Sequence, residues 1–310
     1  MFWSGKKVLI TGAYGFIGSH LTIKLLNKQA DVAVLVRPAS NPWRLQPYLS
    51  HLTVLHASIQ NEQEVMQAVQ QFQPDYIFHL AAYGTDAAKQ NQQEAIAVNV
   101  IGTMNIVNAA KTVNCQKIIQ LGSSSEYGDK TERIYEDMVL EPVDLYGSTK
   151  AAATMLAHQL ANEYDLAFVT LRPFGVFGEK EDTHKLFSYV IQMILSHQEV
   201  KLTACLQYRD YCYVENIVDG MLLAAANPEV KRDIFNIGTG QGHPLTYFVD
   251  LIYEKIGTDQ RPYYGAIPNR INERNAPIPD TTKIQRLLGW KPNVSVEEGL
   301  QKTIAYYKRQ

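Results

Sequence analysis

The sequence predicts an α/β fold in which helices cover a parallel sheet. Short apolar runs, rich in β-branched residues, alternate with segments of helical length, which is the pattern of successive βα units. A glycine-rich turn also lies between the first apolar run and the first amphipathic helix. Ligands of such sheets bind outside the carboxyl ends of the strands. We predict strands at residues 8–11, 32–36, 52–56, 76–80, 117–121 and 167–171, and a last strand at 234–237.

The first element is a buried strand that leads into a glycine loop. Residues 7–11 are apolar, and Gly12, Gly15 and Gly18 follow them, with a helix predicted from about residue 16 to 28. Glycines at such a turn let the backbone approach a pyrophosphate at the N-terminus of the helix. The spacing is Gly-x-x-Gly-x-x-Gly and not the common dinucleotide fingerprint Gly-x-Gly-x-x-Gly. The alternative, a turn without a ligand, fits the flanking strand and helix less well.

The second predicted strand ends without the acidic residue that usually binds the adenosine ribose. Its end reads Val36-Arg37-Pro38, and Ser40 follows. An arginine pairs well with a phosphate group. We therefore predict a preference for NADP(H), with Arg37 on the 2′-phosphate, while NAD(H) stays possible. The alternative is that Arg37 is a solvated loop residue.

A later helix, predicted over residues 146–163, begins with a tyrosine and a lysine four residues apart. Tyr146 and Lys150 then share one face of the helix. A nearby ammonium favours the phenolate and lowers the pKa of a phenol from its reference value of about 10. Such a pair can exchange a proton with the oxygen of a carbonyl or alcohol group. This spacing also arises by chance, and it gains weight from the glycine loop upstream.

Composition indicates a globular protein without a dominant surface charge. Of the 310 residues, 46% are hydrophobic, and the net charge of −2 offers no electrostatic footprint for nucleic acid. Cys115, Cys205 and Cys212 show neither a disulfide framework nor zinc spacing, and we predict no metal site. The chain shows no apolar run of membrane length and no signal-peptide core. We therefore expect a cytoplasmic protein that has no membrane partner.

Several further motifs follow in order along the chain. They are His79-Leu-Ala-Ala82, Asn99-Val-Ile-Gly-Thr103, Leu121-Gly-Ser-Ser-Ser-Glu-Tyr127-Gly, Leu171-Arg-Pro173, Arg209-Asp-Tyr-Cys-Tyr-Val214 and Leu288-Gly-Trp-Lys-Pro292. With the glycine loop and the Tyr146/Lys150 pair, they make the chain resemble the extended short-chain dehydrogenase/reductase family, in its nucleotide-sugar epimerase/dehydratase/reductase branch. The resemblance implies a doubly wound Rossmann sheet with a smaller C-terminal α/β domain for substrate. It places the NAD(P)-binding domain at residues 1–172 and 212–240, and the nucleotide-sugar domain at 173–211 and 241–310.

The resemblance also implies the catalytic residues and the cofactor site. Tyr146 exchanges the proton, Lys150 lowers the pKa of Tyr146 and holds the nicotinamide ribose, and Ser123 hydrogen-bonds the reacting oxygen. Ser123 is preferred to the two serines after it because it lies four residues before Tyr127. The residues implied for the cofactor are Gly12, Tyr14, Gly15, Phe16, Ile17, Gly18, Arg37, Ser58, Ile59, Leu80, Ala81, Ala82, Asn99, Tyr146, Lys150 and Pro173.

The implied substrate is a nucleoside-diphosphate sugar. The resemblance assigns to it Tyr83, Ser124, Ser125, Gly175, Arg209 and Arg270. Arg209 and Arg270 are expected to clamp the diphosphate, because a guanidinium binds phosphate oxygens bidentately. Arg274 competes with Arg270 for this role, and a surface salt bridge is the alternative for each arginine. Gly175 departs from the family pattern, which has an asparagine there.

The sequence disfavours a dehydratase and leaves three functions open: a reductase, an epimerase and a non-catalytic regulator. Family dehydratases carry an Asp-Glu or Ser-Glu pair directly after the catalytic hydroxyl, where this chain has Ser124 and Ser125. Glu126 comes one place later and should face the other side of a strand, so a dehydratase is disfavoured. Arg37 favours NADPH and hence net reduction of the C4 keto group of a 4-keto-6-deoxyhexose nucleotide. The alternative is a C4 epimerase that retains NAD, and a remote alternative is a non-catalytic NAD(P)-binding regulator.

The resemblance further implies a homodimer. Relatives pair two helices of each subunit, which here are predicted at about residues 94–113 and 146–163. Ala151, Ala152, Ala153 and Ala157 would permit close packing of the second helix against its copy. The alternative is that this alanine run packs only inside its own subunit.

Overall fold

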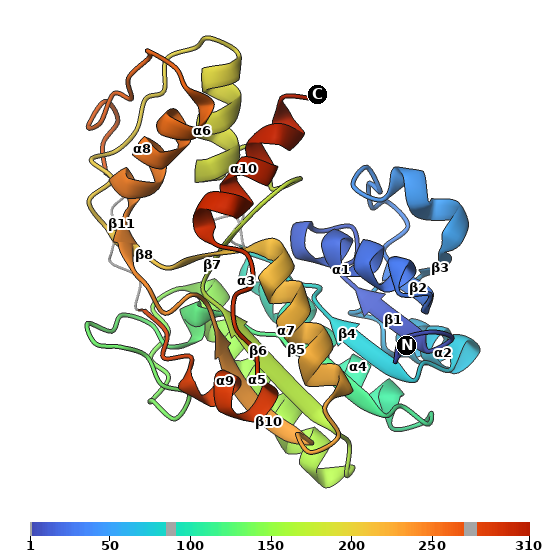
Figure 1. Cartoon of the computed structure of the whole chain (residues 1–310). Helices are drawn as coiled ribbons and strands as arrows, with labels where there is room; N and C mark the ends of the chain where they lie inside the picture. The colour runs from blue at the N-terminus through green and yellow to red at the C-terminus, as the bar shows by residue number, and fades with distance from the viewer. Residues whose placement is uncertain (1, 85–90, 270–277) are drawn as a thin grey trace.

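A seven-stranded parallel sheet forms the centre of the computed structural model, which describes residues 2–84, 91–269 and 278–310 (Figure 1). The strand order is β10-β6-β5-β4-β1-β2-β3. The chain thus starts mid-sheet, winds outward to β3, and returns to wind the other way, which confirms the doubly wound prediction. All predicted strands are present, with ends that differ by at most two residues. The strands are β1 (Lys7–Thr11), β2 (Asp31–Val36), β3 (Thr53–His56), β4 (Tyr76–His79), β5 (Lys117–Leu121), β6 (Phe168–Pro173) and β10 (Arg232–Ile237).

Helices cover both faces of this sheet, as a parallel sheet with apolar strands requires. On one face, α1 (Phe16–Asn27) and α7 (Val214–Ala226) pack side by side, and Leu21, Leu25 and Met221 fill the layer beneath them. The other face carries α2 (Glu62–Phe72), α4 (Gly102–Ala110) and α5 (Leu145–Glu163) over a second apolar layer (Figure 1). The glycine loop lies at the carboxyl end of β1, and the start of α5 lies near the carboxyl end of β5.

The segment before α4 is helical but irregular. It begins as α3 (Gln92–Ala95), continues as a π-helical stretch, η2 (Ile96–Ile101), and runs directly into α4. A single π-type turn inside a longer helix widens the backbone and is often found at functional sites. Asn99 lies within this stretch. The helix predicted at about 94–113 is present, although α4 ends at Ala110.

A smaller lobe packs beyond the carboxyl ends of the strands. Its helices α6 (Leu186–Leu195), α8 (Leu245–Ile256) and α10 (Val296–Tyr307) share an apolar cluster with Phe177 and Phe187, whose rings stack at 4.3 Å. Two short sheets join it to the main sheet: β7 (Gly175–Phe177) with β9 (Tyr211–Tyr213), and β8 (Tyr208–Arg209) with β11 (His243–Pro244). The division into two domains predicted from the sequence stays a prediction at the level of boundaries.

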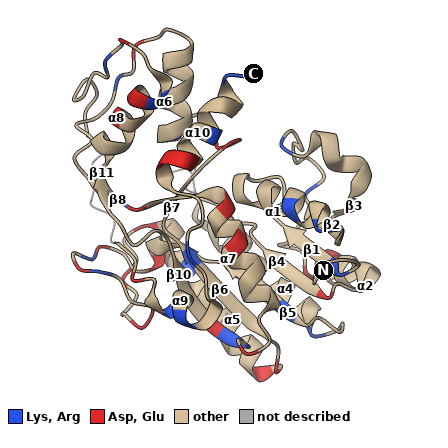
Figure 2. Ribbon diagram, viewed as in Figure 1, with Lys and Arg blue, Asp and Glu red and all other residues tan. Residues whose placement is uncertain are grey.

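Three short helices complete the described part of the chain: η1 (Gln46–His51), η3 (Ser124–Glu126) and α9 (Thr282–Leu288). Basic and acidic residues occur on the helices around the sheet and on the smaller lobe alike (Figure 2). Among the described residues, no helix has the length and apolar character that a bilayer crossing needs.

Candidate active site

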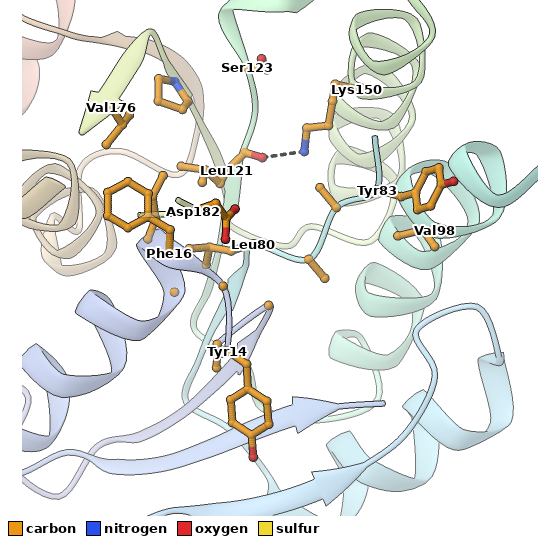
Figure 3. A pocket seen from close by; sticks show the side chains of 18 of the residues that line it. Tyr14, Phe16, Leu80, Tyr83, Val98, Leu121, Ser123, Lys150, Val176 and Asp182 are labelled. Carbon is orange, nitrogen blue, oxygen red and sulfur yellow. Dashed lines mark hydrogen bonds between the residues drawn. The ribbon is translucent and has the colours of Figure 1, made fainter. Parts of the chain in front are cut away.

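A cleft of about 1000 Å³ lies between the sheet and the smaller lobe (Figure 3). Its wall contains every cofactor position predicted from the sequence except Asn99. It also contains five of the six predicted substrate positions, namely Tyr83, Ser124, Ser125, Gly175 and Arg209. The sixth, Arg270, lies outside the described residues, as does its competitor Arg274. Residues that the resemblance implied separately for cofactor and substrate thus meet in one cavity.

The glycine loop forms the floor of the cleft next to β4. Gly12 has a φ of +72°, and a Cβ there would lie 2.6 Å from the backbone nitrogen of Ala81. A Cβ on Gly18 would overlap the carbonyl of Gly12. Side chains at these positions would thus separate the loop from its neighbours. Gly15 begins α1 without a side-chain cap, so amides of the first helical turn are available to an anion in the cleft.

His79 is a buried residue that stabilises the glycine loop and the end of β4. It is buried at the end of β4 between Thr11, at 2.7 Å from Nδ1, and Thr103, at 2.9 Å from Nε2. The Thr11 hydroxyl oxygen also accepts the N–H of Ala81 at 3.2 Å. Burial lowers the pKa of His79 to about 3, so the ring is neutral and stabilises the adjacent loop, residues 80–82, which lines the cleft.

Arg37 lines the cleft directly after β2, at the end where the sequence predicts the adenosine of the cofactor. Its side chain is 66% exposed, and its recorded ion pair, with Glu94, is long at 4.0 Å. Ser40 and Ser58 line the same end. A guanidinium that is mostly hydrated and weakly paired can move onto a phosphate at small cost.

Tyr146 and Lys150 project from the first turns of α5, as their spacing predicts. The Lys150 ammonium is buried and donates to the carbonyl of Leu121 at 2.6 Å, the dashed contact in Figure 3. Burial lowers the pKa of Lys150, and the charge of Glu126 opposes that change. The lysine is therefore held at the carboxyl end of β5, beside the catalytic segment that follows it.

The pKa of Tyr146 differs from the sequence-based expectation. Burial raises it to about 12, an interaction with the Ser123 hydroxyl lowers it in part, and the charges of Glu126 and Asp144 raise it further. Lys150 was expected to lower this pKa, but burial dominates in the structure. The phenol is consequently protonated at neutral pH and suited to donate a proton.

Ser123 lies beyond the end of β5 and caps the one-turn helix η3. Its hydroxyl oxygen accepts the N–H of Ser125 at 3.1 Å, and its own N–H donates to Glu126 at 2.9 Å. The expectation that Glu126 turns away from the cleft agrees with its complete burial, although a helical turn and not a strand produces that direction. Ser123 is the serine whose hydroxyl interacts with Tyr146.

Asn99 does not line the cleft but holds one of its walls. Its side-chain oxygen accepts the N–H of Tyr83 at 2.8 Å, and its amide donates to the carbonyl of Tyr83 and to the Thr149 hydroxyl, both at 2.9 Å. This clamp joins the loop after β4 to α5. The geometry fits a supporting role better than the direct contact with a cofactor that the resemblance implied.

The half of the cleft where the sequence predicts the substrate is formed by the strand ends of the smaller lobe. A Cβ on Gly175 would lie 2.7 Å from the ring of Tyr211 and would overlap the carbonyl of Asp210, so the glycine is required by the β7–β9 pairing. Asp210 is buried and accepts the backbone N–H groups of residues 239–241 at 2.6–3.2 Å. Its carboxylate thus binds backbone groups of the turn after β10.

Sequence reasoning missed a clasp across the cleft. Arg44, from the segment after β2, donates to the carbonyl of Lys180 at 2.8 Å, to Asp182 at 2.5 Å and to the carbonyl of Tyr14 at 3.2 Å. Glu181 is buried in the same segment, and one of its carboxylate oxygens has no hydrogen-bond partner. Burial raises the pKa of Glu181 to about 8. No local sequence pattern predicts these contacts, because Arg44 lies 136 positions from Lys180 and 138 positions from Asp182 in the chain.

A doubly wound sheet whose cleft combines a glycine loop, a Tyr/Lys pair and a serine is the architecture of an extended short-chain dehydrogenase/reductase. Within this class, the chain belongs to the NAD dependent epimerase/dehydratase family, whose sequence profile matches residues 8–238.

Solved structures and characterised relatives align along the whole chain. The UDP-glucose 4-epimerase of Thermotoga maritima, solved with UDP-glucose, is 29% identical with a TM-score of 0.89, over 98% of this chain and 99% of that one. The UDP-glucose 4-epimerase of Thermus thermophilus, solved with NAD, is 25% identical with a TM-score of 0.87, over 97% and 99%. The UDP-glucuronic acid decarboxylase 1 of Xenopus tropicalis is 28% identical over 98% of this chain and 73% of its own length. Relatives at similar distance thus carry out different reactions.

Proposed function

We propose that this protein transfers a hydride between a nicotinamide dinucleotide and C4 of a nucleoside-diphosphate sugar. The observation that carries the proposal is the meeting of Tyr146, Ser123 and Lys150 in the same cleft as the glycine loop. The protein positions the reactants and handles the proton, while the nicotinamide supplies or accepts the hydride. Similar proteins solved with UDP-glucose and with NAD support both ligand classes.

In this proposal, the residues of the cleft divide the work by position. Amides at the start of α1 hold the dinucleotide pyrophosphate, and Lys150 holds the nicotinamide ribose. Arg209 holds the diphosphate of the substrate, with Arg270 as its expected partner. Tyr146 then donates its proton to the C4 oxygen or takes it back, and the Ser123 hydroxyl stabilises the charge on that oxygen.

Net reduction of a 4-keto-6-deoxyhexose nucleotide by NADPH is the first candidate reaction. Arg37 favours it, since an exposed guanidinium stands where NAD-binding relatives of this fold usually carry an acid. The protonated state of Tyr146 fits the donation of a proton to a keto oxygen. C4 epimerisation with a retained NAD is the second candidate, and the similar 4-epimerases favour it.

One experiment separates these candidates. The purified protein is mixed with NADPH or NADH and a panel of 4-keto-6-deoxy sugar nucleotides, and the absorbance of the reduced nicotinamide is followed. A reductase consumes reduced cofactor in proportion to substrate. An epimerase instead converts a UDP-hexose into its C4 epimer, seen by NMR, without net consumption. If neither reaction occurs with any sugar nucleotide, the proposal fails, and the non-catalytic regulator becomes the better reading.

The substrate class has a test of its own in Arg209. Replacement of Arg209 by alanine should raise KM by roughly 10–100-fold, the equivalent of about 1.5–3 kcal/mol for a charged hydrogen bond. Arg286→Ala, at an exposed arginine on α9, is the control and should change neither constant. Unchanged KM and kcat in Arg209→Ala would argue for a surface role of this arginine and against a diphosphate in the substrate.

A further inference from the structure

Glu126 is a buried carboxylate behind Ser123 to which the proposed chemistry gives no part. It is the last residue of η3, and its side chain is completely buried. One carboxylate oxygen accepts the N–H of Ser123 at 2.9 Å, while the Ser123 hydroxyl oxygen accepts the N–H of Ser125. This reciprocal cap fixes both the backbone and the side chain of the serine. The hydroxyl then keeps its own proton as a donor toward the phenol and the reacting oxygen.

The second carboxylate oxygen of Glu126 forms a buried ion pair with Arg172. The Arg172 Nε lies 2.8 Å away, at the carboxyl end of β6. The guanidinium also donates to the Tyr127 hydroxyl at 2.8 Å and lies 4.6 Å from the centre of the Tyr127 ring. That hydroxyl donates in turn to Asn236 on β10 at 2.7 Å. Contacts from β6, β10 and the turn itself therefore fix the carboxylate.

Gly122 makes room for this pair. A Cβ there would lie 2.7 Å from Glu126 Oε1 and 3.1 Å from Arg172 Cγ. A buried ion pair carries a large desolvation cost, and well-packed apolar residues often replace such a pair without loss of stability. Stability alone therefore does not explain why a pair is buried here. Its place directly behind Ser123 suggests a role in the chemistry.

The charge of Glu126 also acts on the other two proposed catalytic groups. It raises the pKa of Lys150 and that of Tyr146. The other titratable groups near this region interact with different residues. Ser123 lowers and Asp144 raises the pKa of Tyr146. Besides the larger effect of burial, the charge of Lys150 lowers the pKa of His79 and the charge of Arg172 lowers that of His158. The charge of Glu136 raises the pKa of Tyr127. Glu126 is the carboxylate that reaches both Tyr146 and Lys150.

We propose that Glu126 is a positioning residue of the active site, which fixes Ser123 through its backbone and, paired with Arg172, holds a negative charge behind Tyr146 and Lys150. The proposal rests on the proposed function. It makes Glu126 a carboxylate whose charge adds to the larger effect of burial in keeping Tyr146 in its proton-donating form. A reductive step that begins with proton donation to a keto oxygen benefits from this bias.

The test uses Glu126→Gln, which keeps the size of the side chain and an acceptor for the N–H of Ser123 but removes the charge. The protein is labelled with difluorotyrosine, whose phenol is more acidic than that of tyrosine. The ionisation of residue 146 is then followed by fluorine NMR, with its signal assigned by its loss in Tyr146→Phe. We expect the titration midpoint to move to lower pH in Glu126→Gln. This readout needs no substrate, so it is independent of whether a sugar nucleotide is turned over.

A second variant covers the case in which an unpaired Arg172 prevents folding. Glu126→Gln combined with Arg172→Met removes both charges and leaves no buried ion, and it should show the same direction of shift. Glu136→Gln is the matched control, because this carboxylate also accepts a backbone N–H, from Asn236 at 2.8 Å, but faces Tyr127. An unmoved midpoint in a folded Glu126 variant, or an equal shift in Glu136→Gln, would overturn the proposal.

Discussion

Among single residues, Tyr146 has the clearest expected effect. In the proposed function its protonated phenol donates to the reacting oxygen, and phenylalanine keeps the ring but removes this proton. Loss of a general acid typically costs 10²–10⁴-fold in rate, so we expect a fall in kcat of roughly that size for Tyr146→Phe. Steady-state kinetics with the substrate found in the panel measures it. Cofactor affinity and circular dichroism should stay unchanged, and turnover close to that of the unmodified protein would contradict the assignment.

Glu181 makes a second prediction at the scale of one residue, and it concerns stability. Burial raises the pKa of its carboxyl from an ordinary value of 4.5 to about 8. Between these values the folded protein keeps a proton that the unfolded chain releases, so the contribution of Glu181 is fully present below 4.5 and is lost as pH rises toward 8. The upper limit of the loss is about 5 kcal/mol.

Replacement of Glu181 by glutamine removes this titration. We expect the free energy of unfolding of Glu181→Gln, relative to the unmodified protein, to increase between pH 5 and pH 9, where denaturant titrations at several values can follow it. Glu132→Gln, at an exposed carboxylate, is the control. A constant difference across this range would show that the carboxyl is not held protonated by burial.

For the elements, we expect the end of β2 to decide the choice between NADPH and NADH. Arg37 is the exposed guanidinium at this strand end, and aspartate in its place would restore the acid that binds a ribose 2′-hydroxyl. Arg37→Asp should weaken NADPH by roughly 1–3 kcal/mol, the scale of charge-assisted hydrogen bonds, and favour NADH. Fluorescence titration with both cofactors measures this change. Equal affinity of the unmodified protein for NADPH and NADH would count against a 2′-phosphate site.

The same scale shows where sequence reasoning succeeds and where it stops. The strands were predictable because each is a local apolar run, and the glycine loop because its spacing is local. The Arg44 clasp was not predictable, since Arg44 and Asp182 meet only through the folded chain. The pKa of Tyr146 was wrong in direction for a similar reason. The i, i+4 spacing reveals the lysine, but only the packed structure reveals the burial that outweighs it.

At the scale of the whole molecule, the expected homodimer stays a prediction, but its structural basis changes. Ala151, Ala153 and Ala157 are buried inside their own subunit and Ala152 is half-buried, so the alanine run offers little surface for the dimer contact that the sequence suggested. The surface of η2 and α5 instead exposes larger apolar side chains, namely Ile96, Ile101, Met155 and Leu156. Exposed apolar side chains gathered on adjacent helices are typical of an interface, and a C₂ dimer is the commonest arrangement.

Met155→Glu tests this surface, since Met155 is 62% exposed on α5. A charge at the centre of an apolar contact should shift the mass measured by light scattering from two chains to one at micromolar concentration. Leu223→Glu is the matched control, because Leu223 is exposed on α7, over the other face of the sheet. A single-chain mass for the unmodified protein would remove the dimer altogether.

The position of β10, late in the chain, has a consequence for the synthesis and the truncation of the protein. β10 pairs with β6, yet residues 174–231 lie between them in the chain. During synthesis, β6 is therefore complete long before its partner strand β10 has been made. Any product that ends before Arg232 leaves β6 as an exposed edge strand of the sheet. Every residue of β6 is buried in the finished sheet, so this edge would be both apolar and rich in unpaired backbone groups. Such edges recruit other chains. Fragments that end near residue 172 should accordingly aggregate, and a soluble excised nucleotide-binding half will need the stretch up to Ile237 to be supplied with it.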